Sequence, residues 1–408
     1  MVRIDRRTIA TLAVLAALLA SCSHGEVSTR SGAPTTIATT EIRPTTTTSA
    51  PSPPTDTGPS IQGVDFLNDE HGYGLLIDQV GDACSLRVAT TADGGSTFSA
   101  AVSVAQGSCQ NGYQETRLVF DGAGDGFVYG PRLYVTHDSG TTWTDASPSG
   151  IVVAVVPFGT TVWRLVAHCE GSPETCSLSL DESSDGGRTW IPSKATLPKA
   201  STFGVLAPPG TSLLVRNSTS SAFLVVPTSP TAATILSTAD GARTWKQSLV
   251  PCLGGWGEIL SRAFDSSLWL ACAGQPGAGS QLKSVVRSLD GGKSWIPGTP
   301  CPPDLTSTTY PPCAESNGLS GGYLSDIVGL SSTTAFIDGG RSFLQVTHDG
   351  GATWSLTKPL VGNGDLSVGG LSFVDPEHGW VIVGESNSAA TLWRTTDGGN
   401  SWQQTYPN

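Results

Sequence analysis

Short apolar segments, separated by polar and glycine-rich turns, run along the chain from residue 61 to the C-terminus. Residues 66–74 and 373–380 share one pattern: an apolar position, an acidic turn that ends in His-Gly, and an aromatic residue that opens the next apolar segment. Looser copies occupy residues 120–127, 264–269 and 328–336. Apolar segments of this kind, with such turns between them, predict antiparallel β-strands joined by hairpins.

A second pattern, [Ser/Thr]-x-Asp-x-Gly-x-[Ser/Thr]-[Trp/Phe], occurs seven times. Ala242 replaces the glycine in one copy, and Phe98 replaces the tryptophan in another. The copies are 45, 47, 55, 50, 59 and 48 residues apart, which is about the length of a four-stranded propeller blade. Their aspartates are Asp93, Asp138, Asp185, Asp240, Asp290, Asp349 and Asp397.

Each residue type in this second pattern has a physical reason. Glycine accepts the positive φ of a tight turn between strands, and the Asp and Ser/Thr side chains hydrogen-bond to nearby backbone amides. The Trp begins the next strand and is expected to bury its ring between neighbouring blades. We therefore expect Ala242 to cost its turn about 1 kcal/mol, so that Ala242→Gly raises the melting temperature.

The repeats predict an all-β fold, a seven-bladed β-propeller with four-stranded antiparallel blades over residues 61–408. Charged residues make up only 14 % of the chain, and the single methionine is the first residue; this composition fits strands and turns better than long helices. Two ways of closing the ring remain open. Residues before Gly63 supply an outer strand to the last blade, or the ring closes without strand exchange.

The second pattern is identified as the Asp box and resembles the repeat of sialidases and other Asp-box propellers. Combined with the His-Gly-[Tyr/Trp] hairpins, it also resembles the photosystem II assembly and stability factor family of propellers over most of residues 61–408. This second resemblance implies that arginines on the blades contribute to a partner-binding surface. Arg287 and Arg394 directly precede their Asp boxes, but the other copies carry different residues there, so the arginine pattern is incomplete.

The first 60 residues are predicted to export and anchor the protein. Residues 1–22 read as a lipoprotein signal peptide, because arginines precede an apolar run over residues 9–20 that is too short to span a bilayer. The run ends in Leu-Ala-Ser-Cys, which resembles a bacterial lipobox and predicts acylation of Cys22; ordinary cleavage near Ala20 is the alternative. The Thr/Pro-rich residues 23–60 predict a disordered tether. We expect a bacterial cell-membrane lipoprotein outside the cytoplasm.

Eight cysteines follow Cys22, an even number that suggests disulfides in an oxidising compartment. The sequence allows 105 pairings, and we expect nearest neighbours to pair because each pair then falls within one repeat or its adjoining loop. No CxxC motif or histidine cluster predicts a metal or cofactor. The net charge of −12 and the lack of a basic stripe argue against nucleic-acid binding. The expected pairs are Cys84–Cys109, Cys169–Cys176, Cys252–Cys272 and Cys301–Cys313.

Catalysis finds little support in the sequence. Seven equivalent aspartates in a radial repeat are scaffold, and a glycosidase needs two carboxylates that flank the scissile bond. The Arg-Ile-Pro motif of sialidases does not occur. Of the histidines outside the first 60 residues, His168 is the one without a repeat equivalent, and we expect a structural or surface role for it.

Function is instead expected in the loops that break the repeat, because propellers bind through loops around the central channel. The longest interval between Asp boxes carries Tyr310 and Tyr323, and the loop over residues 251–258 carries Trp256 and Glu258. These four are the candidate ligand-binding residues. We expect a non-catalytic, lipid-anchored module for protein interaction or envelope assembly, with a glycan-binding or sialidase-like glycoside hydrolase propeller as the alternative.

Overall fold

A computed structural model describes residues 60–407 apart from several short segments. The chain divides into two units, residues 1–54 and 55–408, and every described residue belongs to the second unit. The segments within this range that are not described are residues 110–115, 170–174, 207–212, 230–231, 250–257, 278–279, 298–318, 320–321, 339–343, 358–365 and 386–387.

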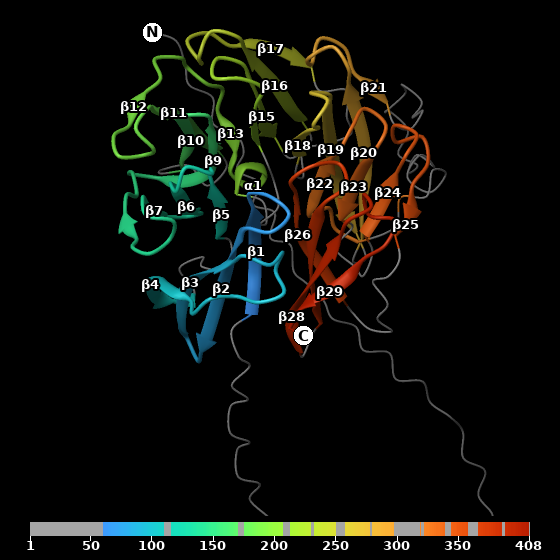
Figure 1. The fold of residues 1–408 in the computed structure, drawn as a ribbon. Coiled ribbons are helices and arrows are strands. Elements are labelled where there is room, and N and C mark those ends of the chain that lie inside the picture. Colours follow the sequence, from blue (N-terminus) through green and yellow to red (C-terminus); the bar gives the residue numbers. More distant parts are fainter. Residues whose placement is uncertain are drawn as a thin grey trace, which may run out of the picture. The chain divides into compact units, whose positions relative to one another are not determined.

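The strands form seven antiparallel sheets, each built from four strands that follow one another in the sequence (Figure 1). The first blade contains β1 (Ser60–Phe66), β2 (Gly72–Val80), β3 (Ala83–Thr91) and β4 (Val102–Ser108). The second contains β5 (Arg117–Phe120), β6 (Gly126–Tyr129), β7 (Leu133–Thr136) and β8 (Thr144–Asp145). The third contains β9 (Ile151–Phe158), β10 (Thr161–His168), β11 (Thr175–Ser183) and β12 (Ile191–Pro192), with β13 (Ala200–Ser201) paired to β11 and followed by α1 (Thr202–Val205).

The remaining four blades repeat this order. The fourth contains β14 (Leu214–Arg216), β15 (Ala222–Ser229), β16 (Ala232–Thr238) and β17 (Lys246–Leu249), and the fifth β18 (Glu258–Arg262), β19 (Leu268–Gly277), β20 (Ser280–Ser288) and β21 (Ile296–Pro297). The sixth contains β22 (Asp326–Gly329), β23 (Ala335–Asp338), β24 (Leu344–Thr347) and β25 (Ser355–Leu356), and the seventh β26 (Leu366–Phe373), β27 (Gly379–Glu385), β28 (Ser388–Thr395) and β29 (Gln403–Tyr406). The predicted seven-bladed propeller is confirmed.

The seven copies of the second sequence pattern form one kind of turn, the repeat turn, between the third and fourth strands of each blade. In the third blade the Ser183 hydroxyl donates to Asp185 Oδ1 (2.8 Å) and accepts from the Gly187 amide (2.7 Å). The Asp185 carboxylate also accepts from the Thr189 amide (2.8 Å) and hydroxyl (2.7 Å), and these bonds from Thr189 hold the pKa of Asp185 down to about 2. The same four bonds recur in the other six blades. The aspartates are therefore fully engaged in the scaffold.

The glycine of the repeat turn meets two demands at once. Gly187 and Gly292 have φ of +86° and +76°, and Ala242 has φ +60° at the same position, as the sequence predicts. A Cβ added to Gly187 would lie 2.7 Å from the Phe127 ring of the preceding blade, and one added to Gly292 would lie 2.7 Å from Phe223. The glycine is thus needed for close approach as well as for backbone conformation.

Phe127 and Phe223 belong to a set of aromatic residues, one at the same place in the second strand of each blade. All seven are at least nine-tenths buried. They lie in the apolar clusters that join neighbouring blades, together with the rings that follow the repeat turns. The seven are Tyr73, Phe127, Trp163, Phe223, Trp269, Phe336 and Trp380.

The ring closes where the first blade, blue in Figure 1, meets the seventh, red. Phe66 stacks on Trp380 with ring centroids 3.6 Å apart, and the Trp380 indole donates to the Gly94 carbonyl (2.9 Å). The Phe66 amide donates to the Ser372 hydroxyl (3.4 Å). Since both blades consist of four consecutive strands, the ring closes without strand exchange.

Candidate functional site: the channel and its mouth

The order of the strands gives the propeller two distinct ends. The repeat turns lie at one end, which we call the turn end. Every fourth strand runs away from that end, so the first strand of the next blade begins at the opposite end, which we call the mouth. The strands that flank the undescribed segments within the propeller likewise begin or end at the mouth.

A cavity of about 1000 Å³ runs along the first strands of all seven blades. It is a central channel of the size that holds small ligands or side chains of a bound chain. Among the described lining residues, four have an acidic or basic side chain: Arg117, Arg216, Arg262 and Asp326. The lining comprises residues 61–64, 116–120, 129, 154–158, 214–216, 260–262, 325–328, 369–371, 382, 384 and 390.

Two opposite charges belong to the mouth of this channel. Arg117 is the first residue of β5, and Asp326 is the first residue of β22, so both start an inner strand. Burial raises the pKa of Asp326 to about 8, and the positive charge of Arg117 acts against this rise. The interaction places a guanidinium from the second blade within electrostatic reach of a carboxyl group from the sixth.

The boundary between the fifth and sixth blades adds a buried amine, which interacts electrostatically with Asp338 of the sixth blade. Lys283 is 5 % exposed, and its Nζ donates to the carbonyls of Gly322 (2.6 Å) and Gln281 (3.3 Å). The Gln281 side chain accepts from the Leu324 amide (3.2 Å), and the Gln281 amide donates to Gly322. These bonds fix the chain on both sides of Tyr323, whose side chain is exposed.

The turn end of the channel carries cations that are already engaged. Arg216 donates to the Val156 and Thr161 carbonyls, to the Thr161 hydroxyl and to the Thr219 carbonyl, and its guanidinium lies over the Trp163 ring. Burial lowers the pKa of Arg216 to about 10. Arg216 thus ties the fourth blade to the third, and we assign it a structural role.

The structure separates the four residues predicted from the loops. Tyr323 is exposed just before β22, near the channel wall. Glu258 is the first residue of β18 and is fully buried, so it is part of the blade rather than of an open loop. Trp256 and Tyr310 lie outside the described residues, as does Cys22.

Arg117, Asp326 and Lys283 escaped the sequence analysis because they lie in strands and belong to neither repeated pattern. For Arg117 and Asp326 the one signal is a charged side chain in an otherwise apolar strand, and that signal does not show which charges lie close together. The two arginines suggested by the family resemblance both contact a neighbouring blade: Arg287 donates to the Ser332 carbonyl of the next blade, and Arg394 lies over Trp380 and against the turn at Gly94.

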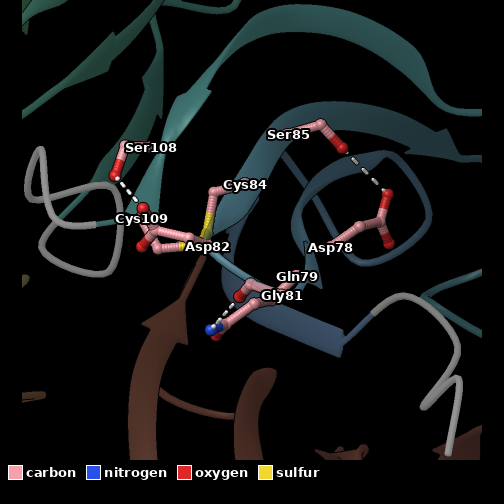
Figure 2. Close-up of a disulfide and its surroundings, with 8 residues drawn as sticks. All are labelled: Asp78, Gln79, Gly81, Asp82, Cys84, Ser85, Ser108 and Cys109. Carbon is pink, nitrogen blue, oxygen red and sulfur yellow. Dashed lines mark hydrogen bonds between the residues drawn. A yellow bond between two sulfur atoms is a disulfide. The ribbon is translucent and has the colours of Figure 1, made fainter. Parts of the chain in front are cut away.

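Disulfides reinforce the mouth. Cys84 pairs with Cys109, where β3 begins and β4 ends (Figure 2), and Cys169 pairs with Cys176 between β10 and β11. These two predicted pairs are confirmed. Cys272 is also disulfide-bonded, while Cys252, Cys301 and Cys313 lie outside the described residues. The disulfides indicate an oxidising compartment outside the cytoplasm.

No helix in the described part of the chain is long and apolar enough to cross a bilayer.

Two aspartates at the mouth, Asp326 and Asp338, differ in their exposure to the channel. Asp326 lines the cavity, whereas Asp338, its partner across the β22–β23 pair, is fully buried. Among the described lining residues, a single carboxyl group therefore faces the channel. Glycoside hydrolysis, whether by an acid and a nucleophile or by an acid and a base, needs two carboxyl groups that reach the substrate.

Known structures share this architecture. No protein-family model matches the chain, and no curated protein matches it. A structure of YCF48 bound to a D1 peptide matches with 16 % identity and a TM-score of 0.52, over 83 % of this chain and 92 % of that one. YCF48 from Cyanidioschyzon merolae matches with 16 % identity and a TM-score of 0.53, over 85 % and 98 %. A Hadza microbial sialidase matches with 12 % identity and a TM-score of 0.43, over 83 % and 65 %.

At these identities the likeness concerns the fold. The chain is a seven-bladed propeller with a ligand-sized channel, and the expected resemblance to photosystem II assembly-factor-like propellers is found at this level.

Proposed function

We propose that this protein is a non-catalytic propeller that binds a protein partner at the mouth of its channel. The observation that carries the proposal is the channel wall, in which one carboxyl group faces the cavity and its neighbour across the strand pair, Asp338, is fully buried. The wall provides a contact surface of apolar and small side chains with few charges. Such a surface suits an inserted peptide segment better than an acid–base reaction.

The disulfides at the mouth support the same proposal. A binding surface that is fixed before the partner arrives loses less conformational entropy on association. Cys84–Cys109 and Cys169–Cys176 each close a short segment at this end, and Tyr323 is held between bonded neighbours. The YCF48 structure with a bound D1 peptide gives a precedent for peptide binding by a propeller of this architecture.

The proposal includes a membrane anchor at Cys22. The lipobox-like sequence and the Thr/Pro-rich residues 23–60 would hold the propeller outside the cytoplasm, near the membrane, where it would serve interaction or envelope assembly. Metabolic labelling with an alkyne fatty acid tests this part: the label should appear on the wild type and disappear in Cys22→Ala. Labelling that survives this substitution would contradict the anchor.

Site-specific crosslinking in the native host tests the partner site. A photoreactive amino acid at Tyr323 should yield one major protein adduct, and the same group at Ile191, exposed on the outer strand of the third blade, should not. Arg117→Gln should weaken the adduct at Tyr323. Equal adducts at the two positions, or an adduct that Arg117→Gln leaves unchanged, would argue against binding at the mouth.

The second candidate is a glycan-binding or glycoside hydrolase propeller of sialidase type. Asp326 favours it, because a carboxyl group with a pKa of about 8 is protonated at neutral pH and suits a general acid. A panel of fluorogenic glycosides decides the question. Hydrolysis by the wild type that is lost in Asp326→Asn would replace the non-catalytic proposal, whereas no hydrolysis and no glycan-array binding would remove this alternative.

A further inference from the structure

Asp326 and Asp338 face one another across the first two strands of the sixth blade. Side chains at directly opposite positions of an antiparallel pair lie on the same side of the sheet, with Cβ atoms about 4.5–5.5 Å apart. Asp338 is fully buried, and Asp326 is in the channel wall. Two ionised carboxylates this close, in a poorly hydrated place, repel one another strongly.

Positively charged groups on the neighbouring strands act on both carboxyl groups. Lys283 from the fifth blade acts on Asp338, and Arg117 from the second blade acts on Asp326. The fifth blade also carries the buried acid Glu258 at this end. The adjacent inner strand of the seventh blade, β26, has no ionisable side chain, and a Cβ added to its Gly369 would lie 3.9 Å from Asp338 Oδ2.

The protonation of Asp326 follows from this environment. Burial raises its pKa most, and the charge of Asp338 also raises it, while Arg117 and the hydrogen bond from the Ile327 amide (2.8 Å) lower it; the net result is a pKa of about 8. Burial also lowers the pKa of Lys283 to about 8. Interacting groups of this kind titrate as a unit rather than one by one.

We propose that Asp326 and Asp338 hold one proton between them at neutral pH, and that this proton sets the charge of the channel mouth. Among these four groups, with the proton in place, Arg117 and Lys283 outweigh the pair by one positive charge. When the proton leaves, the four groups balance, and loss of the Lys283 proton shifts the mouth further in the same direction. An anionic group of a ligand would therefore be held more tightly below this transition than above it.

The statement about ligands rests on the proposed function, but the titration does not. It is measured on the ligand-free protein, so its failure would leave partner binding untouched. A failure to find a partner would equally leave the shared proton untouched.

Two backbone amides report on the relevant carboxyl groups. The Ile327 amide donates to Asp326 Oδ1 (2.8 Å), and the Phe120 amide donates to Asp65 Oδ2 (2.6 Å), so each resonance follows the ionisation of its acceptor. Burial raises the pKa of Asp65 to about 7, against the bond from Phe120, which makes Phe120 an internal control. The measurement is an amide NMR titration of the ²H,¹⁵N-labelled protein from about pH 5.5 to about pH 9.5, a range that covers both expected midpoints.

In the wild type, the Ile327 resonance should move with a midpoint near 8 and that of Phe120 with a midpoint near 7. Asp326→Asn should abolish the first transition and leave the second. Asp338→Asn should lower the Ile327 midpoint, because the repulsive charge is removed. An Ile327 resonance that stays flat in the wild type, or a midpoint that Asp338→Asn leaves unchanged, would overturn the shared proton. The Asp338→Asn comparison and the wild-type curve remain decisive if Asp326→Asn does not fold.

Discussion

Reciprocal substitutions in the repeat turn separate the two demands on its glycine, positive φ and close approach of a ring. Gly187 has φ +86°, and an added Cβ would lie 2.7 Å from the Phe127 ring. Gly187→Ala therefore incurs about 1–2 kcal/mol for the left-handed conformation and about 1–3 kcal/mol for overpacking. It regains about 0.4–1 kcal/mol because the unfolded chain is less flexible. We expect a net loss of about 2–4 kcal/mol in the free energy of unfolding.

The opposite substitution in the next blade, Ala242→Gly, should not raise the free energy of unfolding by the same amount. Ala242 has φ +60°, but its methyl group is 2 % exposed and packs in the apolar cluster that contains Trp163. Ala242→Gly relieves about 1–2 kcal/mol of backbone strain, loses about 0.8 kcal/mol of methyl burial, and loses about 0.4–1 kcal/mol through the more flexible unfolded chain. These contributions cancel to within about 1 kcal/mol. The stabilisation expected from the sequence is thereby reduced, since the sequence does not show that the methyl group is buried.

Urea unfolding of the wild type and both variants at pH 7, followed by tryptophan fluorescence and circular dichroism, measures the two changes. Coincident transitions and equal slopes are the control that the variants unfold in the same way. Changes of equal size and opposite sign would refute the reasoning, because they would mean that φ alone governs this position and that the ring of the preceding blade does not matter.

Four further predictions follow from the same structure. The pKa of Asp65 is raised to about 7, so the stability this group contributes is present at acid pH and lost as pH rises from about 4 to 7; thermal melts should show a smaller loss over this range in Asp65→Asn than in the wild type, because the raised pKa of Asp326 contributes to the loss in both. The pKa of Asp240 is lowered to about 2, chiefly by the Thr244 hydroxyl, so Asp240→Asn should lower the melting temperature at pH 7, and the gap should close as pH falls towards 2. Trp380→Ala removes the stack that closes the ring and should cost about 3–5 kcal/mol by denaturant unfolding, whereas the exposed Phe264→Ala should cost under about 0.5 kcal/mol. Replacing both Cys84 and Cys109 by serine should cost about 3 kcal/mol, and an unchanged urea midpoint would show that the disulfide adds nothing to stability.

The sequence by itself determined the fold, because a propeller repeats its unit. Each blade needs a turn with the same hydroxyls, carboxylate and glycine, so the same residue types recur in the sequence of each blade. The spacing of Asp93, Asp138 and their equivalents then gives the length of a blade. It also determined two disulfides, since Cys84 and Cys109, like Cys169 and Cys176, lie within one blade and pair locally. Local interactions are legible in a sequence because the partners are close along the chain.

The tertiary structure alone decided where the ring closes, and which charges meet. Phe66 and Trp380 stack although more than 300 residues separate them, and the Phe66 amide reaches Ser372 across a separation of 306. Arg117 and Asp326 belong to different blades, and only the closed ring brings their inner strands around one channel. Nothing local in either strand encodes that meeting. Burial, which raises the pKa of Asp326 and makes Glu258 part of a blade rather than of a loop, is likewise a property of the assembled ring.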